Sequence, residues 1–139
     1  MRKIRKIILH CSVGNPSTKA RQIVAYHLRS KAAGGRGWKA PGYHYIIEED
    51  GTVVATHPEE KVSNGVTGHN SDSIHICYTG GVDISNPKLP PKDTRTPAQR
   101  LSMRRLVGEL QKRYPEAGLH GHYEFANKAC PSFRVPDEL

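Results

Sequence analysis

The residues of this chain best suited to chemistry are two histidines and a cysteine that could bind one metal ion. His122 and Cys130 lie eight positions apart in the segment HGHYEFANKACPSF, residues 120–133, and His10 follows a short apolar run near the N-terminus. A catalytic zinc ion takes three protein ligands and keeps a fourth position open for water or substrate. His122 and Cys130 offer two ligands, and His10 is the expected third. The chemistry of such a site is hydrolysis by an activated water molecule.

Spacing alone leaves other interpretations of these residues open. His120 lies on the same face as His122 if that segment is extended, so spacing does not separate the two. A histidine on a strand is more often a hydrogen-bonded structural residue than a ligand, and a chain with eight histidines places one near a cysteine by chance. Cys11 and Cys77 lie in predicted strands, where free cysteine behaves as a small apolar residue.

Local sequence signals predict the elements that must position these residues. KIRKIILHCS, residues 3–12, is rich in β-branched residues and runs into a Gly-Asn-Pro turn, so it predicts a first strand with His10 near its end. YHYIIEEDGTVVATH, residues 43–57, carries Asp-Gly between two β-rich runs and predicts a hairpin. The remaining predicted elements are a further strand and two helices: residues 72–81, 17–31 and 97–114.

The second helix has the clearest boundaries. Thr96 is expected as its N-cap, Pro97 as its first helical residue and Gln99 as the residue that bonds back to the cap. Tyr114 and Pro115 end the helix, and the rest of the chain is expected to be a loop. The order strand, helix, hairpin, strand, helix, loop predicts an α/β fold.

Length and charge favour one domain over residues 1–139 and an anionic partner. A chain of 139 residues can bury a single core around a sheet. Its 21 Lys and Arg residues against 13 Asp and Glu give a formal net charge of +8, which favours binding to nucleic acid, a membrane surface or an anionic polymer. Nucleic acid is not expected, because the basic residues are spread over both ends and both helices and an aromatic content of 6% is thin for base stacking.

Cysteine content and the N-terminus predict a cytoplasmic product. Three cysteines without a CxxC pair do not indicate a disulfide framework. MRKIRKIILHCSV begins like a signal peptide, but His10 interrupts its apolar run well short of the roughly 7 to 15 residues that such a peptide needs. No stretch approaches the ~18 apolar residues of a membrane span. We therefore expect synthesis in the cytoplasm without an export signal of its own.

Five motifs, in the same order, resemble one family of enzymes. The motifs are HCS at 10–12, GYHYII at 42–47, SIHICYTGG at 73–81, TPAQ at 96–99 and KACPSF at 128–133. Together they span nearly the whole chain and resemble the zinc-dependent N-acetylmuramoyl-L-alanine amidases of the phage lysozyme type, which share a fold with peptidoglycan recognition proteins. The resemblance implies a single α/β domain with a central mixed, mainly β, sheet flanked by helices.

The resemblance also implies a role for individual residues. It selects His122 over His120 and gives one zinc ion three ligands: His10, His122 and Cys130. Zinc lowers the pKa of a bound water toward ~7 and polarises the scissile carbonyl. Two further residues are then expected to be catalytic. Lys128 would stabilise the developing oxyanion, and the Tyr43 hydroxyl would orient the water or relay its proton to the leaving amine.

Two positions depart from the family's usual pattern. The related enzymes generally read Tyr-Asn before their serine strand and Ser-Ile-Gly within it, where this chain has His-Asn at residues 69–70 and Ser-Ile-His at residues 73–75. His69 is a candidate for substrate contact, and His75 either lines the groove or faces solvent. Trp38 is expected either to form a wall of the groove or to cap the core.

The activity implied is hydrolysis of the amide between N-acetylmuramic acid and L-alanine in peptidoglycan. A phage or prophage endolysin, antimicrobial and acting on the cell wall after release, fits this chain, and a monomer is expected. Anionic cell-wall polymers are further expected partners of a chain with charge +8. The alternative is a non-catalytic peptidoglycan-binding module on the same fold. Binding-only members of the fold typically replace the ligand cysteine, so the presence of Cys130 favours hydrolysis.

Overall fold

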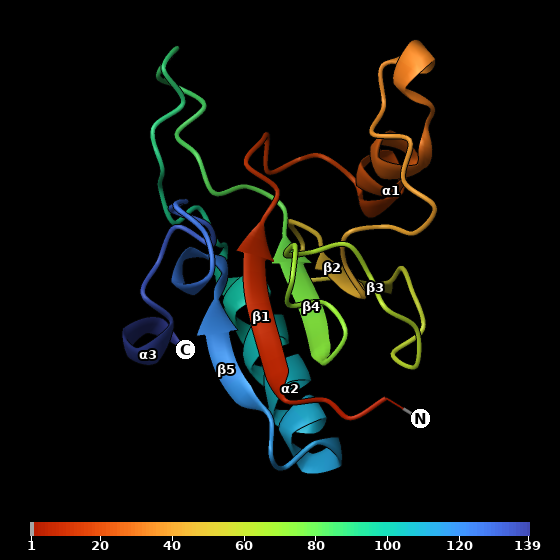
Figure 1. Ribbon diagram of the computed structural model, residues 1–139. Helices are drawn as coiled ribbons and strands as arrows, with labels where there is room; N and C mark the ends of the chain where they lie inside the picture. Colours follow the sequence, from red (N-terminus) through yellow and green to blue (C-terminus); the bar gives the residue numbers. More distant parts are fainter. Residues whose placement is uncertain (1) are drawn as a thin grey trace.

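A five-stranded mixed sheet runs through the protein, whose computed structural model describes residues 2–139, the side chains of residues 137 and 138 excepted (Figure 1). The strands are β1 (Lys6–Cys11), β2 (Tyr45–Ile47), β3 (Val53–Ala55), β4 (Ser73–Tyr78) and β5 (Gly118–Gly121). Their order across the sheet is β3-β2-β4-β1-β5. β1 runs parallel to β4 and β5, and β2 runs parallel to β4, whereas β3 at the edge runs antiparallel to β2.

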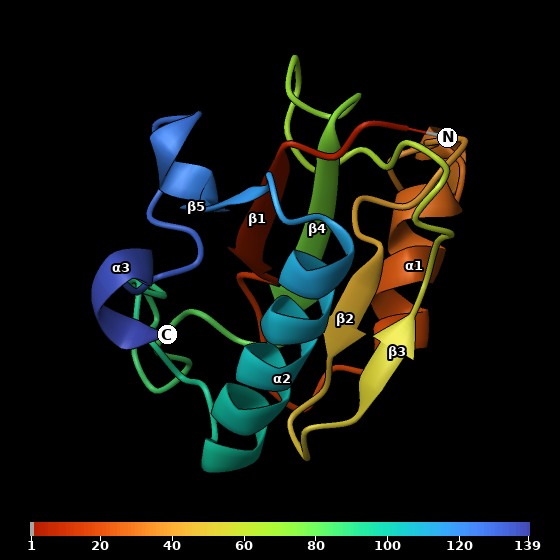
Figure 2. The ribbon, with the colours of Figure 1, turned by 90° about the horizontal axis from the view of Figure 1, so that it is seen from below.

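Two longer helices, α1 (Ala20–Leu28) and α2 (Pro97–Arg113), pack against opposite faces of the sheet (Figure 2). A short helix, α3 (Val135–Glu138), lies near the C-terminus, and 3-10 turns occupy Lys31–Ala33 and His122–Glu124. This arrangement confirms the α/β fold and the mixed sheet that the sequence predicts. No helix within residues 2–139 has both the length and the apolar character that a bilayer crossing requires.

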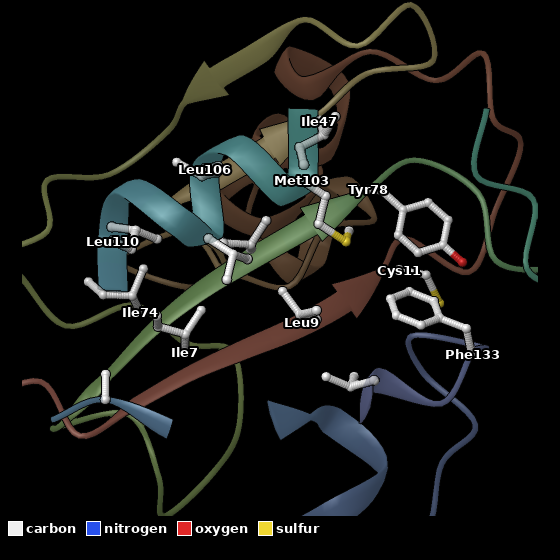
Figure 3. Close-up of a cluster of buried hydrophobic side chains, with 14 of the residues drawn as sticks. Ile7, Leu9, Cys11, Ile47, Ile74, Tyr78, Met103, Leu106, Leu110 and Phe133 are labelled. Carbon is white, nitrogen blue, oxygen red and sulfur yellow. The ribbon is translucent and has the colours of Figure 1, made fainter. Parts of the chain in front are cut away.

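The main hydrophobic core fills the space between the sheet and α2 (Figure 3). Successive residues of a strand point to opposite faces, and the apolar side chains of Ile7 and Leu9 in β1 point toward α2. They share the core with four buried residues of that helix: Met103, Leu106, Val107 and Leu110. His10, whose strand partner is Cys77, therefore lies on the face that α1 covers.

The predicted start of α2 is confirmed. The Thr96 hydroxyl accepts a hydrogen bond from the N–H of Gln99 at 3.0 Å, the Gln99 side chain accepts one from the N–H of Thr96 at 3.0 Å, and Pro97 opens the helix. The buried Gln99 amide also donates to the carbonyl oxygens of Ile47 and Thr79, each at 3.2 Å. One glutamine thus both caps the helix and ties it to the ends of two strands.

Two segments differ from the prediction. The first helix begins at Ala20 and ends at Leu28, inside the predicted range 17–31, because residues before it form a turn in which the N–H of Ser17 donates to the Asn15 side chain at 2.9 Å. The chain after α2 is not all loop, since residues 118–121 form β5. GLHG has little strand propensity of its own, and its partner β1 lies more than a hundred residues away in sequence, so no local signal indicates it.

Candidate metal centre

Two neighbouring parallel strands bring His10 and His122 together. His10 is the penultimate residue of β1, and His122 follows directly after β5. Because β1 and β5 pair in parallel, their C-terminal ends meet at one edge of the sheet, which is where ligands bind in open α/β sheets. The Nδ1 atoms of the two imidazoles face each other at 3.2 Å.

Cys130 reaches the same edge on a loop that is anchored on both sides of it. The N–H of Cys11 donates to Cys130 Sγ at 3.1 Å, and the N–H of Tyr123 donates to the Cys130 carbonyl oxygen at 2.9 Å. The hydroxyl of Tyr78, a fully buried residue of β4, donates to the carbonyl oxygen of Pro131 at 2.6 Å. These bonds hold the thiol beside the end of β1.

The three predicted ligands form one buried group. The donor atoms of His10, His122 and Cys130 all lie within 4.8 Å of one another. Zn–N bonds of ~2.0–2.1 Å in a tetrahedron place two nitrogens about 3.3 Å apart, which matches the 3.2 Å observed between the imidazoles. These residues can therefore hold a metal ion. His120 lies outside the group, with Nδ1 2.9 Å from Glu124 Oε1.

Burial sets the protonation of these side chains. It lowers the pKa of His10 well below its ordinary value and also lowers the pKa of His122, and the positive charge of Lys128 adds to both effects. Both imidazoles are therefore neutral at pH 7, the state that binds a metal. Hydrogen bonding with Cys11, together with burial, raises the pKa of Cys130. A metal ion opposes this effect, because a coordinating thiol loses its proton.

Two cavities meet at His122, one of the three predicted ligands. Their volumes are about 490 Å³ and about 340 Å³. They share five lining residues: His27, Arg36, Tyr43, His122 and Lys128. The two cavities together therefore form one groove. Of the three predicted ligands, His122 lines both cavities and Cys130 lines the first.

Both predicted catalytic side chains border the groove. The ring centroid of Tyr43 lies 5.0 Å from that of His10. Burial, and then the neighbouring Cys77, raise the pKa of the Tyr43 hydroxyl well above its ordinary range, so the hydroxyl keeps its proton and can donate a hydrogen bond. Lys128 is exposed, and within residues 2–139 its ammonium group has no hydrogen bond or ion pair. Its charge is therefore available to a substrate.

The other residues singled out in the sequence differ in their relation to the groove. Trp38 lies in the wall of the second cavity, as one of its two expected roles requires. His69 lines neither cavity, and its ring packs on Phe125 with the centroids 4.5 Å apart. Phe125 itself lines the second cavity, so His69 contacts a residue of the groove wall but is not part of that wall. Substrate contact by His69 stays a prediction.

Sequence reasoning missed two of the five residues that line both cavities. Arg36 borders both cavities, with its guanidinium 5.8 Å from the ring centroid of Tyr26 and 5.2 Å from that of Trp38. His27 also borders both cavities and accepts a hydrogen bond from the N–H of Gly42 at 3.0 Å. A single arginine in GGRGW and a single histidine in a helix carry no distinctive signal, so only the folded arrangement identifies them.

His75 neither lines the groove nor faces solvent, and both expectations for it were wrong. Its side chain is fully buried, and its Nδ1 lies 2.8 Å from Nε2 of His10. Burial lowers its pKa to about 3. The reason is register: His75 is paired with Ile8 in the neighbouring strand, so it lies on the same face of the sheet as His10 and directly behind it.

Comparison with known proteins identifies the family. The family model described as N-acetylmuramoyl-L-alanine amidase matches residues 1–133, a range that contains every metal-binding and groove residue described above. The chain belongs to this amidase family. The endolysin of Klebsiella phage KP32 is 40% identical to it over 128 residues, which cover 92% of this chain and 80% of that protein.

Solved structures show the same amidase fold. The Ph2119 endolysin from Thermus scotoductus MAT2119 bacteriophage Ph2119 matches with a TM-score of 0.76 and 29% identity, covering 93% of this chain and 77% of that one. Drosophila PGRP-LB matches with a TM-score of 0.74, covering 94% of this chain and 76% of that one. Its identity is 18%, so this second likeness is one of fold.

Proposed function

We propose that this member of the amidase family hydrolyses the amide between N-acetylmuramic acid and L-alanine in peptidoglycan, with one zinc ion held by His10, His122 and Cys130. The observation that carries the proposal is the buried group of two imidazoles and one thiol beside the groove, which His122 and Cys130 line. Three nitrogen and sulfur ligands leave the fourth position of a tetrahedral zinc ion for water or substrate. That open position favours hydrolysis over binding alone.

The chain's own contribution is a set of donor atoms held in place before the substrate arrives. The bound zinc ion would supply a Lewis acid for the scissile carbonyl and a lowered pKa for the attacking water. His10 and His122 are fixed at the ends of paired strands, and the N–H of Cys11 steadies the sulfur of Cys130. Fixed donors avoid reorganisation during the reaction, which is the main source of electrostatic catalysis.

Lys128 and Tyr43 provide the charge and the proton that amide hydrolysis needs. The exposed ammonium of Lys128 borders the groove and would compensate the negative charge that develops on the carbonyl oxygen. Among the residues that line the two cavities there is no Asp or Glu, so a carboxylate base has no place there. The hydroxyl of Tyr43, which keeps its proton, would orient the attacking water or pass a proton to the leaving amine.

The rest of the groove suits an anionic, partly apolar substrate. Arg36 and Lys128 place two positive charges along it, and Trp38 and Phe125 provide apolar wall. Stem peptides of peptidoglycan carry carboxylates, which guanidinium and ammonium groups bind. His69 would contact the substrate from beside Phe125. The net charge of +8 would also hold the protein on anionic cell-wall polymers.

The proposed biological role is that of an endolysin, the name carried by the phage relatives described above. As such the protein would open the bacterial cell wall at the end of a phage or prophage cycle. We also propose that residues 1–139 form one amidase domain and that the protein works as a monomer, because one chain supplies the complete group of metal-binding residues.

The test is digestion of defined peptidoglycan with and without a zinc chelator, with the products identified by mass spectrometry. Free stem peptides that begin with L-alanine should appear, disappear on chelation and return when zinc is added. Intact peptidoglycan with the zinc-loaded protein would contradict the proposal. Binding of peptidoglycan without cleavage, unaffected by chelation, would identify a binding module instead.

A further inference from the structure

A line of polar side chains, two buried histidines and a half-buried asparagine, runs behind the predicted metal ligand His10. Nε2 of His10 lies 2.8 Å from Nδ1 of His75, and Nε2 of His75 lies 2.8 Å from Oδ1 of Asn70. That same Asn70 oxygen accepts the N–H of Val66 at 2.8 Å. The line thus leads from the proposed metal ligand through a second imidazole to a polar group fixed by the backbone.

The hydrogen bonds in this line can run in one direction only. The Asn70 atom that faces His75 accepts a backbone N–H, so it is the amide oxygen, and Nε2 of His75 must carry the proton between them. The fully buried His75 ring, with no carboxylate in contact among residues 2–139, is neutral, so its Nδ1 is an acceptor. His10 therefore donates through Nε2 and keeps the lone pair of Nδ1, the atom that faces His122.

The surroundings hold His75 in one place. Its N–H donates to Nδ1 of His44 at 3.0 Å, its carbonyl oxygen accepts the N–H of His44 at 2.9 Å, and the two rings are stacked with 9° between their planes. Gly65 lies against the His75 ring, and a Cβ at that position would come within 2.3 Å of His75 Nδ1. The imidazole therefore has room because residue 65 is glycine, and the two residues belong to one arrangement.

We propose that His75 is a positioning residue for metal binding, and that with Asn70 it fixes both the orientation and the tautomer of His10. A ligand histidine commonly donates its second ring nitrogen to a neighbouring acceptor, which selects the nitrogen left for the metal. Here the acceptor is a second histidine, His75, whose other ring nitrogen is bonded to Asn70. The inference rests on the proposed role of His10 as a ligand and explains why its Nδ1 is ready to bind.

The first test reads the tautomer directly in the metal-free protein. Long-range ¹H–¹⁵N NMR spectra of the histidine rings should show His10 and His75 both protonated at Nε2 and not at Nδ1. This measurement uses the wild-type chain and needs neither zinc nor activity. His10 protonated at Nδ1 would overturn the inference.

The second test measures zinc affinity by competition with a chromogenic chelator. His75→Leu fills similar space without an acceptor and should weaken zinc binding ~10- to 100-fold, the usual cost of losing such a partner. His75→Gln offers a side-chain oxygen to His10 and should recover most of the loss. His120→Ala, a histidine outside the metal-binding group, is the matched control and should bind zinc like the wild type.

Two further results separate this inference from the proposed function. His10→Ala should lose more zinc affinity than any His75 variant. If His10→Ala leaves affinity unchanged, the ligand assignment itself is wrong. If His10→Ala loses affinity but a folded His75→Leu does not, or if His75→Gln is no better than His75→Leu, the ligand assignment stands and the positioning role of His75 is refuted. Should His75→Leu fail to fold in thermal unfolding, the wild-type tautomer spectrum still decides the question.

Discussion

Tyr78→Phe should loosen the loop that carries Cys130 while leaving the hydrophobic core packed. The Tyr78 side chain is fully buried, and its hydroxyl donates to the carbonyl oxygen of Pro131, the residue after Cys130, at 2.6 Å. Within residues 2–139 no other donor reaches that oxygen. Phenylalanine keeps the ring and its contact with Phe133, whose centroid lies 6.2 Å away, so the change removes one hydrogen bond and little else.

The expected loss of stability follows from the Pro131 carbonyl oxygen, which Tyr78→Phe leaves without a hydrogen-bond donor. A buried carbonyl that loses its donor costs ~1 to 3 kcal/mol, more than the net value of an average hydrogen bond. The free energy of unfolding of the metal-free protein should fall by that amount. Zinc affinity should fall as well, because the same bond anchors the residue beside the sulfur ligand.

Urea unfolding in the presence of chelator gives the stability change, and chelator competition gives the zinc affinity. Tyr26→Phe is the matched control, because Tyr26 is 44% exposed, and it should unfold like the wild type. A Tyr78→Phe protein with wild-type stability would refute the reasoning, since the Pro131 oxygen would then have found another donor. Lower stability with unchanged zinc affinity would show that the loop does not need this anchor to hold Cys130.

Three further predictions concern the site and its protonation. Cys130→Ser should abolish amidase activity and most zinc affinity, and an active, zinc-loaded variant would remove Cys130 from the ligand set. Lys128→Ala should keep zinc but slow turnover by roughly 10², the usual scale for losing an oxyanion partner; wild-type turnover would exclude Lys128 from the mechanism. Burial lowers the pKa of His44 to about 4. The unfolded chain therefore binds more protons below pH ~6.5, so up to about 3 kcal/mol of stability that is present above that pH should be lost as the pH falls through 4. Denaturation of the metal-free protein at pH 7 and pH 4.5 measures this loss, and a His44→Gln variant with an equally large loss would contradict it.

Local patterns in the sequence predicted those elements that a few adjacent residues specify, such as a turn or a helix cap. The Asp50-Gly51 pair predicted the hairpin, and Gly51 has a φ of +90°. The N–H of Glu48 donates to the carbonyl oxygen of Thr52, so the turn holds three residues, 49–51. The start of α2 follows from the cap at Thr96. β5 escaped prediction because what stabilises it is pairing with β1, far away in the sequence. A local sequence pattern carries no information about pairing between segments that are so far apart.

The residues of the site also differ in whether the sequence could predict them. Residue types and family motifs pointed to His10, His122 and Cys130, and the structure brings these three together. The position of His75 could not be read from its neighbours, because it depends on the register between β4 and β1 and on the space left by Gly65. The same holds for Arg36, which reaches the groove only through the fold of the chain after α1.

The three proposed metal ligands come from segments that are far apart in the sequence. His10 and His122 are 112 positions apart, and the contact between Cys11 and Cys130 joins residues 119 positions apart. A bound ion would therefore act as a cross-link that closes residues 10–130 into one loop, and closing a long loop restricts the unfolded state more than closing a short one. A nascent chain that has not yet reached Cys130 lacks one of the three proposed ligands. The site would thus be complete only after residue 130 has been made, and loss of the ion would loosen the connection between these distant segments.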